Sequence, residues 1–503
     1  MHDFPGTVFL AGAGPGDPGL LTLRAAELLT NCDCVVYDYL VNPAILARIP
    51  AHVERHFVGK RGGRASASQD EINRMLIELA QTHQRVLRLK GGDPFLFGRG
   101  GEEAAALAEA GVPFEVIPGV TSGIGVPAYA GIPVTHRAAS SVVAFATGHQ
   151  AKGETEDLDW AGLARIETVV LYMGMHKLAQ NCASLIAHGR SADTPACAIQ
   201  WGSYARQRVV VGTLATLPQL AAEAKLGAPA ITVIGEVVRY REKIRWFDNR
   251  PLSGRRVVVT RSREQASELC DLLGRVGAEV VEAPVARQEV PTSWDDLDGT
   301  LRAMRTFRWV VFTSANSVRF TWERLRALNL DARAFANSRI AAIGPTTAAL
   351  LAERGLIADL VPHQYDAASL AKALVTREAL PPNVLLPQAD NAKPILRDHL
   401  RQAGCAVTTA IAYRTLPVPF TLDPELPVDA VTFASSATVE RFVAGLGKER
   451  IAALLTAGCR FYAIGPHTAA TMTTHGLPIA ATAEEATIPA LVQAVVRDLS
   501  SAP

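Results

Sequence analysis

Two glycine-rich blocks, each placed between an apolar run and a helical pattern, constrain the fold of the first half of this chain. Ala11–Ala25 reads AGAGPGDPGLLTLRA, and Arg88–Glu103 reads RLKGGDPFLFGRGGEE. Glycine lets the backbone approach a ligand closely, and a helix that follows such a loop presents free N–H groups at its N-terminus. Two such loops at strand ends in one domain predict a shared cleft for a small polar ligand.

The spacing of these glycines excludes the common phosphate-binding loops. Gly12, Gly14 and Gly16 run G-x-G-x-G, and Asp17 stands where the dinucleotide fingerprint G-x-G-x-x-G requires its last glycine. The sequence also contains no G-x-x-x-x-G-K-[ST]. We therefore expect the ligand to be neither a dinucleotide nor a nucleoside triphosphate.

Short β-branched runs alternate with helical patterns along the first half of the chain. Strands are expected at Thr7–Ala11, Cys34–Tyr37, Arg85–Leu89, Phe114–Ile117, Val142–Thr147, Thr168–Tyr172, Ala196–Gln200 and Ala230–Gly235. Helices are expected at Leu20–Leu29, Gln69–Leu79, Glu102–Ala110 and His176–Ile186. The alternation predicts an α/β fold with largely parallel strands, which bind ligands beyond the carboxyl ends of the strands.

The second half of the chain contains an internal repeat. FTSANSV begins at residue 312 and FASSATV at 433, while AIGPTTAALLAERGL begins at 342 and AIGPHTAATMTTHGL at 463. Both pairs are therefore offset by 121 residues. One offset shared by two motifs predicts two similar α/β lobes, although the spacing is too long for a solenoid. We expect the Thr- and Ser-rich strand ends of the two lobes to face each other across a cleft.

A charged segment separates the two halves. A chain of 503 residues is too long for one hydrophobic core. Tyr240–Arg256 reads YREKIRWFDNRPLSGRR and is followed by a new strand at Val257–Thr260. We therefore expect one domain at residues 1–245, a linker at 246–254, and a second domain at 255–503 made of the two repeated lobes.

Composition limits the class of protein. The formal net charge of +1 argues against non-specific binding to nucleic acid. The seven cysteines are scattered and form no CxxC pair, which predicts neither a disulfide framework nor a metal site. Cys32 and Cys34 are interpreted as packed thiols. The sequence has no apolar run long enough for a membrane span and no signal-peptide pattern at MHDFPGT, so a cytoplasmic protein is expected.

The first 245 residues or so resemble the uroporphyrinogen-III C-methyltransferases of the tetrapyrrole methylase family. The resemblance is carried, in family order, by AGAGPGDPGLLTLRAAELL, VVYDYLV, VGKRGG, RLKGGDPFLFGRGGEE, VIPGVTSGIGVPAYAGIPVTHR, ATGH, VVLYMG and ITVIGEVV. It implies two α/β lobes with S-adenosyl-L-methionine bound in the cleft between them. Matching the motifs assigns the donor to Pro15, Gly91, Gly92, Asp93, Leu96, Thr121, Ser122, Met173, Gly202 and Ala230.

The same resemblance implies residues for the chemistry. Methylation of a pyrrole carbon must be followed by loss of a proton, which requires a base. Asp38 is the family's candidate base, and Lys60 is its candidate acid or anion partner. Read as isolated residues, Asp38 fits a strand-end cap and Lys60 a solvated charge better than catalytic roles, and it is the family match that favours catalysis. Glu102 and Glu103 are interpreted as first-turn helix residues favoured by the helix dipole rather than as catalytic carboxylates.

The substrate that the resemblance implies is a tetrapyrrole with eight carboxylates. Basic residues crowd the predicted cleft, and arginine binds carboxylates in a bidentate manner. These residues are Lys60, Arg61, Arg64, Arg88, Lys90, Arg99 and Arg137, of which Arg61, Arg64 and Arg99 are assigned to the substrate. The resemblance also implies a homodimer formed through this half.

Residues 255–500 or so resemble uroporphyrinogen-III synthases. The resemblance is carried by VVVTR, VVFTSANSV, AAIGPTTAALL, LLPQADNAKPIL, AIAYRT, VTFASSATV and AIGPHTAA. It implies closure of linear hydroxymethylbilane into a ring with inversion of the last pyrrole and without a cofactor. Tyr413 occupies the family position for the weak acid that assists loss of the substrate hydroxyl. A tyrosine that simply packs between the lobes is the alternative.

Hydroxyl and glycine positions in the repeats are assigned to the same substrate. They are Thr313, Ser314, Asn316, Gly344, Thr346, Ser435, Ser436, Gly465 and Thr468. None is paired with an evident His/Asp couple, so these positions suit a polyanion better than nucleophilic catalysis. His467 departs from the threonine that the family commonly has after Gly-Pro, and its role is left open.

The sequence thus predicts a bifunctional enzyme that makes uroporphyrinogen III and methylates it twice to precorrin-2, for siroheme or cobalamin. No metal site is predicted. Two alternatives stay open. In one, the second half is a non-catalytic tetrapyrrole-binding module. In the other, the first half methylates a later corrin intermediate.

Overall fold

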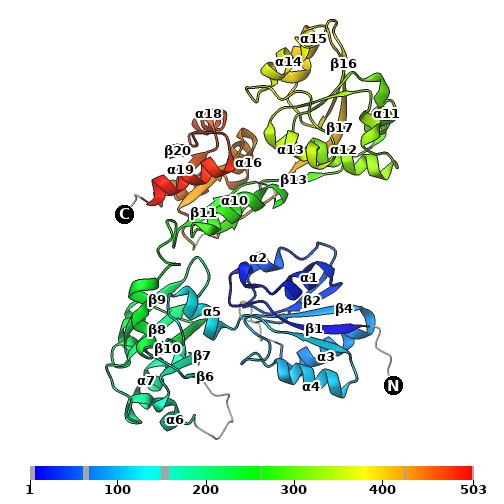
Figure 1. Ribbon diagram of the computed structural model, residues 1–503. Helices are drawn as coiled ribbons and strands as arrows, with labels where there is room; N and C mark the ends of the chain where they lie inside the picture. The colour runs from blue at the N-terminus through cyan, green and yellow to red at the C-terminus, as the bar shows by residue number, and fades with distance from the viewer. Residues whose placement is uncertain (1–5, 60–66, 149–157, 262, 424–425, 501–503) are drawn as a thin grey trace. The chain divides into compact units, whose positions relative to one another are not determined.

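A computed structural model describes residues 6–59, 67–148, 158–261, 263–423 and 426–500 (Figure 1). The chain forms two compact units. The first comprises Met1–Val257, Leu272–Val280 and Val496–Pro503, and the second comprises Val258–Asp271 and Val281–Val495.

The first lobe contains a parallel sheet with helices on both faces. Its strands are β1 (Thr7–Gly12), β2 (Cys34–Tyr37), β3 (Glu54–Phe57), β4 (Arg85–Lys90) and β5 (Phe114–Ile117), in the order β3-β2-β4-β1-β5. Its helices are the 3-10 turn η1 (Pro18–Leu20), α1 (Leu23–Asn31), α2 (Pro43–Leu46), α3 (Gln69–Thr82) and α4 (Gly100–Glu109). Helices α1 and α2 cover one face of the sheet, and α3 and α4 cover the other (Figure 1). The central strands are buried on both faces, which explains their continuous apolar runs.

The second lobe begins at α5 and contains a mixed sheet. Its strands are β6 (Val143–Thr147), β7 (Thr168–Tyr172), β8 (Pro195–Gln200), β9 (Arg208–Thr213) and β10 (Ala230–Ile234), in the order β6-β7-β10-β8-β9. Its helices are α5 (Ser122–Tyr129), α6 (Trp160–Arg165), η2 (Met175–Lys177), α7 (Leu178–Ala187), α8 (Leu217–Glu223), η3 (Glu236–Tyr240) and α9 (Arg241–Ile244). Only β6 and β7 are parallel, while the other three pairings are antiparallel. The expectation of largely parallel strands is therefore wrong for this lobe, because hydrophobic periodicity carries no information on strand direction.

The segment expected to be a linker, residues 246–254, is part of the first unit and packs on α5. Trp246 donates a hydrogen bond from Nε1 to the carbonyl of Ala128 at 3.0 Å. The ring centroids of Phe247 and Tyr129 are 4.7 Å apart, and Leu252 is fully buried. Charge and a proline suggested an open connection, yet the aromatic residues between them anchor this segment to α5.

The second half forms two further five-stranded sheets. One has the order β12-β11-β18-β19-β20 and the other the order β13-β17-β16-β14-β15. The strands are β11 (Arg256–Val259), β12 (Glu279–Glu282), β13 (Ala286–Glu289), β14 (Trp309–Phe312), β15 (Arg339–Ala342), β16 (Asn383–Ala389), β17 (Ala406–Pro417), β18 (Ala430–Phe433), β19 (Arg460–Ala463) and β20 (Ala481–Thr482). The helices are α10 (Arg263–Arg275), α11 (Asp295–Arg302), η4 (Met304–Thr306), α12 (Ala315–Ala327), η5 (Ala332–Phe335), α13 (Pro345–Glu353), α14 (Ala367–Val375), α15 (Ile395–Gln402), α16 (Ser436–Leu446), α17 (Lys448–Thr456), α18 (Pro466–Thr474) and α19 (Ile488–Ser500).

The sequence repeat corresponds to a repeated structural unit. The succession β14, α12, β15, α13 in one sheet matches β18, α16, β19, α18 in the other, and every element begins 121 residues after its counterpart. In both units the two strands are adjacent and parallel. The prediction of two similar α/β lobes is therefore confirmed.

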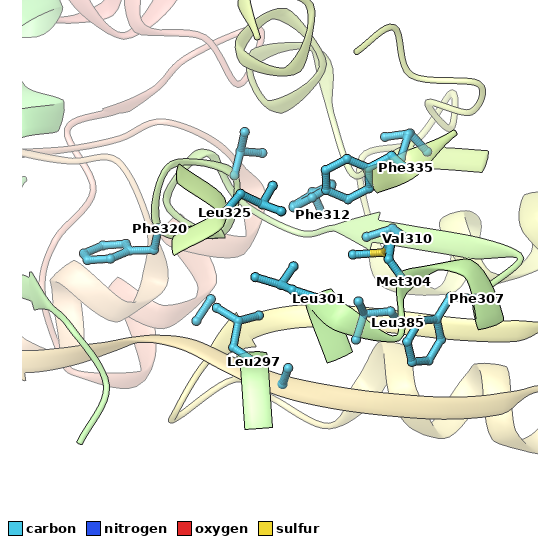
Figure 2. Close-up of a cluster of buried hydrophobic side chains, with 14 of the residues drawn as sticks. Leu297, Leu301, Met304, Phe307, Val310, Phe312, Phe320, Leu325, Phe335 and Leu385 are labelled. Carbon is cyan, nitrogen blue, oxygen red and sulfur yellow. The ribbon is translucent and has the colours of Figure 1, made fainter. Parts of the chain in front are cut away.

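Each lobe of the second half has its own hydrophobic core. Figure 2 shows the cluster around β14, in which apolar side chains from α11, α12 and the strands gather. Phe320 of α12 lies at one end of the labelled side chains (Figure 2). Its ring stacks on that of Tyr413, with centroids 5.3 Å apart. Full burial of each large apolar side chain contributes about 1.5–3 kcal/mol, so this cluster fixes β17 against α12.

All seven cysteines are free, and Cys32 and Cys34 are buried thiols, as predicted. Burial raises the pKa of the Cys34 thiol to about 12. Among the described residues, no helix has the length and hydropathy of a membrane span.

Candidate functional site

A cavity of about 720 Å³ in the first half is lined by residues of both lobes. The two glycine-rich loops meet there, since Gly92 donates its N–H to the carbonyl of Gly14 at 2.7 Å and Gly14 donates in return at 3.1 Å. Both glycines have positive φ angles, 73° and 70°, which non-glycine residues rarely adopt. The predicted shared cleft therefore forms at the carboxyl ends of β1 and β4.

The two aspartates of the Gly-Asp-Pro sequences shape these loops. Asp17 accepts from the N–H of Gly19 through Oδ1 at 2.7 Å, and its Oδ2 accepts from the hydroxyl of Tyr129 at 2.8 Å. Asp93 accepts from the N–H of Phe95 at 2.8 Å, and its Oδ2 accepts from the N–H of Gly119 at 2.9 Å. Each carboxylate closes a tight turn and ties it to a second segment, while the following proline lacks an N–H that would need a partner.

Helices follow both Gly-Asp-Pro sequences within a few residues, as expected. Asp17 caps the 3-10 turn η1, α1 begins at Leu23, and α4 begins at Gly100 after its N-cap Arg99, which lines the cavity. A third helix start, outside both blocks, also borders the cavity, since Thr121 and Ser122 at the start of α5 line it. The hydroxyl of Tyr172 accepts from the N–H of Gly123 at 2.6 Å and lies 2.7 Å from Oγ1 of Thr121, which fixes this helix start against β7.

All ten residues assigned to the methyl donor line this one cavity, together with Asp38 and Arg99. They come from loops after β1, β4, β5, β7 and β8 and from the start of β10. Arg99 is exposed and paired with the equally exposed Glu102 at 2.7 Å. Lys60, Arg61 and Arg64 lie outside the described residues.

Backbone strain is concentrated at the cavity. Seven non-glycine residues among those described have positive φ angles, and four of them, Phe97, Arg99, Met173 and Trp201, line it. Such conformations cost about 1–3 kcal/mol each and persist where the surrounding structure imposes them, often at ligand sites. The strain supports a ligand-binding role for the cavity independently of the motifs.

Aromatic residues that motif matching missed also form the cavity wall. Tyr172, Trp201 and Tyr204 line it, and Trp201 lies against Tyr204 with ring centroids 5.4 Å apart. The guanidinium of Arg206 lies 3.9 Å from the Trp201 ring centroid, a cation–π contact. Burial raises the pKa of Tyr204 to about 12. The signal was present in the sequence, because Tyr172 precedes Met173 and Trp201 precedes Gly202.

Asp38 follows β2 at the edge of the cavity with a partly exposed carboxylate. Its Oδ1 accepts from the N–H of Leu40 at 3.2 Å, and its Oδ2 lies 3.6 Å from Nη2 of Arg88. Arg88 and Lys90 of β4 are buried and share Glu103 of α4 as a partner. Glu103 does lie in the first turn of α4, as predicted, yet it is fully buried in an ion cluster that the sequence did not reveal.

Replacing Gly12 by alanine is expected to destabilise the first half. A Cβ atom at Gly12 would lie 2.5 Å from the carbonyl oxygen of Gly92 and 2.6 Å from Cα of Gly119, both backbone atoms that side-chain motion cannot clear. Overpacking of this kind costs about 1–3 kcal/mol. Gly101→Ala is the control, because a Cβ there meets nothing within 4 Å. Thermal unfolding of both variants measures the difference, and equal midpoints would contradict the expectation.

In the second half, Tyr413 of β17 lies beside the end of β14. Its hydroxyl is 3.1 Å from Oγ of Ser314, the N-cap of α12. Burial raises the pKa of Tyr413, and hydrogen bonds from Ser314 and Asn316 oppose that rise. Tyr413 is 7% exposed, so it is at once a core residue and a polar group beside the start of α12.

The other assigned positions follow the repeat. Ser314 and Ser435 are N-caps of α12 and α16, and Gly344 and Gly465 are N-caps of α13 and α18. Thr313 is half-buried, Asn316 is buried, and the side chain of Ser436 donates to the carbonyl of His467 at 3.1 Å.

Thr346 and Thr468 are not equivalent positions. Thr346 is exposed, and its counterpart 121 residues on is His467, also exposed. Thr468 is buried inside α18, where its counterpart is the buried Thr347. A ligand at these helix starts would therefore meet Thr346 and His467, while Thr468 contributes to the core.

Comparison with known proteins adds independent findings. Residues 7–218 match the family described as Tetrapyrrole (Corrin/Porphyrin) Methylases, and residues 267–493 match that described as Uroporphyrinogen-III synthase HemD. The porphyrin biosynthesis protein HemD of Ruminiclostridium josui is 37% identical over 463 residues, which cover 90% of this chain and 91% of that protein. The chain belongs to the family that fuses a tetrapyrrole methylase to a uroporphyrinogen-III synthase.

It is thus a bifunctional enzyme of tetrapyrrole biosynthesis, with a methyltransferase half and a synthase half. The siroheme synthase of Pseudomonas aeruginosa is 54% identical over 248 residues, covering 49% of this chain and only 53% of that protein. The chain therefore spans about half the length of such relatives.

Solved structures of separate enzymes resemble each half. A uroporphyrin III C-methyl transferase from Thermus thermophilus is 40% identical, with a TM-score of 0.41, and covers 46% of this chain and 99% of its own. A mutant uroporphyrinogen III synthase from Thermus thermophilus is 24% identical, with a TM-score of 0.38, and covers 49% of this chain and 100% of its own.

Proposed function

We propose that the second half closes hydroxymethylbilane to uroporphyrinogen III and that the first half methylates this product twice, giving precorrin-2. S-adenosyl-L-methionine is the methyl donor in this proposal. The observation that carries it is the convergence of all ten assigned donor positions and Asp38 on one cavity. These positions were assigned by sequence motifs that lie far apart in the chain, and the motifs alone do not require them to line the same cavity.

The cavity suits the donor in size and in chemistry. Its volume of about 720 Å³ falls in the range of small-molecule sites, roughly 300–1,000 Å³. Apolar side chains such as Leu96 and Ile231 lie beside backbone groups of the glycine-rich loops and the start of α5, as a ligand with an aromatic base and a polar amino-acid end requires. Glycine at positions 91 and 92 leaves the backbone open to close approach.

The donor supplies a methyl group on a positively charged sulfur. When the new C–C bond forms and the C–S bond breaks, that positive charge passes to the macrocycle, which then loses a proton. In the proposal Asp38 accepts this proton, and its side chain borders the cavity with both oxygens oriented by neighbours. The positioning of the two reactants supplies much of the rate.

In the synthase half, we propose that Tyr413 assists departure of the substrate hydroxyl. The pyrrole nitrogen stabilises the cation that remains, so a weak acid held near the leaving group suffices. The Ser314 hydroxyl 3.1 Å away orients the Tyr413 hydroxyl. The helix starts that carry Gly344 and Gly465 suit the substrate carboxylates, because their N–H groups lack partners within the helix.

The test feeds hydroxymethylbilane to the purified protein with and without S-adenosyl-L-methionine and separates the oxidised products by chromatography. We expect the type III isomer without the donor and a dimethylated product with it. The type I isomer alone, which forms spontaneously, would mean that the second half is a binding module. Methylation of a corrin but not of uroporphyrinogen III would favour the later-intermediate alternative.

We also propose a cellular location, an oligomeric state and domain limits. We place the enzyme in the cytoplasm, where seven free thiols remain reduced. We also propose a homodimer formed through the methyltransferase half, which sedimentation of the purified protein would test. The domain limits stay at 1–245 and 255–503 in this proposal.

A further inference from the structure

A buried cluster of charges lies beside the methyltransferase cavity, which two of its members, Arg88 and Lys90, line. Arg88 and Lys90 are two residues apart on β4, so their side chains leave the same face of the sheet, and they are 3% and 4% exposed. Oε1 of Glu103, which is fully buried, accepts from Nε of Arg88 at 3.2 Å and from Nζ of Lys90 at 2.7 Å. Val86, earlier on the same face, packs in an apolar core with α3 and α4.

This cluster is poorly suited to stabilising the fold. Removing charges from water costs several kcal/mol per ion, and replacing a buried ion pair by apolar side chains is often neutral or stabilising. Oε2 of Glu103 has no hydrogen-bond partner within the described part of the chain. Burial, and next the nearby charge of Arg88, lowers the pKa of Lys90. Apolar residues at positions 88 and 90 would extend the apolar face that Val86 begins. Fold stability alone therefore does not explain why Arg88 and Lys90 stand there.

The geometry connects the cluster to Asp38. The planar guanidinium of Arg88 bonds to Glu103 through Nε, and its Nη2 lies 3.6 Å from Oδ2 of Asp38. Because the guanidinium is rigid, fixing one edge also fixes the direction of the other. The N–H of Leu40 donates to the other oxygen of Asp38, Oδ1, at 3.2 Å. The Asp38 carboxylate is therefore held on both oxygens at the cavity edge.

We propose that Glu103 is a positioning residue for methyl transfer, which acts by holding Arg88 against Asp38. Arg88, Lys90 and Asp38 line the cavity, whereas Glu103 is not among the lining residues, so Glu103 acts through its partners. Lys90 and Gln69 also donate to Glu103, but Arg88 is the partner that lies 3.6 Å from Asp38. The inference rests on the proposed role of Asp38 as proton acceptor. It assigns a function to a carboxylate that the sequence pattern explains by the helix dipole alone.

A double-mutant cycle on the full chain tests the inference. Glu103→Gln keeps the shape of the side chain and removes its charge, and we expect kcat for methylation of uroporphyrinogen III to fall roughly 10- to 100-fold. The KM for the tetrapyrrole should change little, because Glu103 does not line the cavity. Adding Glu103→Gln to Arg88→Met should cause no further loss, because the first residue acts through the second. Additive losses, or an unchanged kcat in Glu103→Gln, would overturn the inference.

A matched control and a binding measurement separate positioning from damage to the fold. Glu109→Gln removes an exposed carboxylate from the same helix and should keep the full rate. Calorimetric affinity for S-adenosyl-L-methionine should be equal in all variants. Glu103→Gln alone changes the net charge of the cluster, whereas the double variant with Arg88→Met removes one positive and one negative charge. If Glu103→Gln loses donor binding, kcat of the double variant is therefore compared with that of Arg88→Met alone. A lower kcat in the double variant would refute the inference.

The same experiment distinguishes failure of the inference from failure of the proposed function. Asp38→Asn is measured alongside. A normal rate in Asp38→Asn would remove the base on which the inference rests. A slow Asp38→Asn beside a normal Glu103→Gln would leave the proposed function intact and refute the positioning role alone.

Discussion

Replacement of Asp38 by asparagine is expected to lower kcat for methylation of uroporphyrinogen III by about 10²- to 10⁴-fold, the usual contribution of a positioned general base. Asparagine keeps an oxygen that can accept the N–H of Leu40, so the turn after β2 should persist. What is lost is a carboxylate at the cavity edge that can accept the proton from the methylated macrocycle. Single-turnover methylation, monitored by chromatography of the oxidised product, gives the rate directly.

Two controls define the meaning of that result. Asp193→Asn removes an exposed carboxylate from the second lobe and should leave the rate unchanged. The affinity of Asp38→Asn for S-adenosyl-L-methionine should equal that of the unaltered protein, since the donor contacts are kept. A nearly normal rate in Asp38→Asn would mean that Asp38 only caps the strand end, the alternative that the sequence left open.

Most strand positions in the first half could be predicted from the sequence, because hydrophobic periodicity indicates which residues form a strand. Eight expected strands of the first half correspond to β1, β2, β4, β5, β6, β7, β8 and β10, whereas β3 and β9 were not expected. Glu54–Phe57 reads ERHF, too short and polar a run to signal a strand, yet it pairs along the edge of the sheet beside β2. Strand direction in the second lobe depends on tertiary pairing, so periodicity could not give it.

The candidate site was likewise predictable where it depends on local motifs and not where it depends on tertiary contacts. Motif spacing identified the residues of the glycine-rich loops, because those loops follow strands whose carboxyl ends must meet at one sheet edge. The roles of Asp17 and Asp93 could not be read in this way, since each bonds to a segment distant in sequence, at Tyr129 and Gly119. The burial of Glu103 likewise depends on how α4 packs on β4, and Glu102 beside it is exposed.

Replacement of Tyr413 by phenylalanine should separate the two readings of that residue. Phenylalanine keeps the stacking on Phe320 and loses one hydroxyl, whose hydrogen bond to Ser314 contributes about 0.5–1.5 kcal/mol to stability. If the hydroxyl assists departure of the substrate hydroxyl, ring closure should slow by roughly 10²-fold, within the range of general acid catalysis. The type I isomer should then accumulate at the expense of type III.

The two activities of one chain supply the control for this variant. Tyr413→Phe should methylate added uroporphyrinogen III at the normal rate, because Tyr413 belongs to the other half. Tyr462→Phe, a fully buried tyrosine of β19, should keep both activities. Undiminished ring closure in Tyr413→Phe would make Tyr413 a core residue, in which case the acid must be sought among the other polar groups at the helix starts. His467 is then the first candidate, because it is exposed where the equivalent position of the repeat has Thr346.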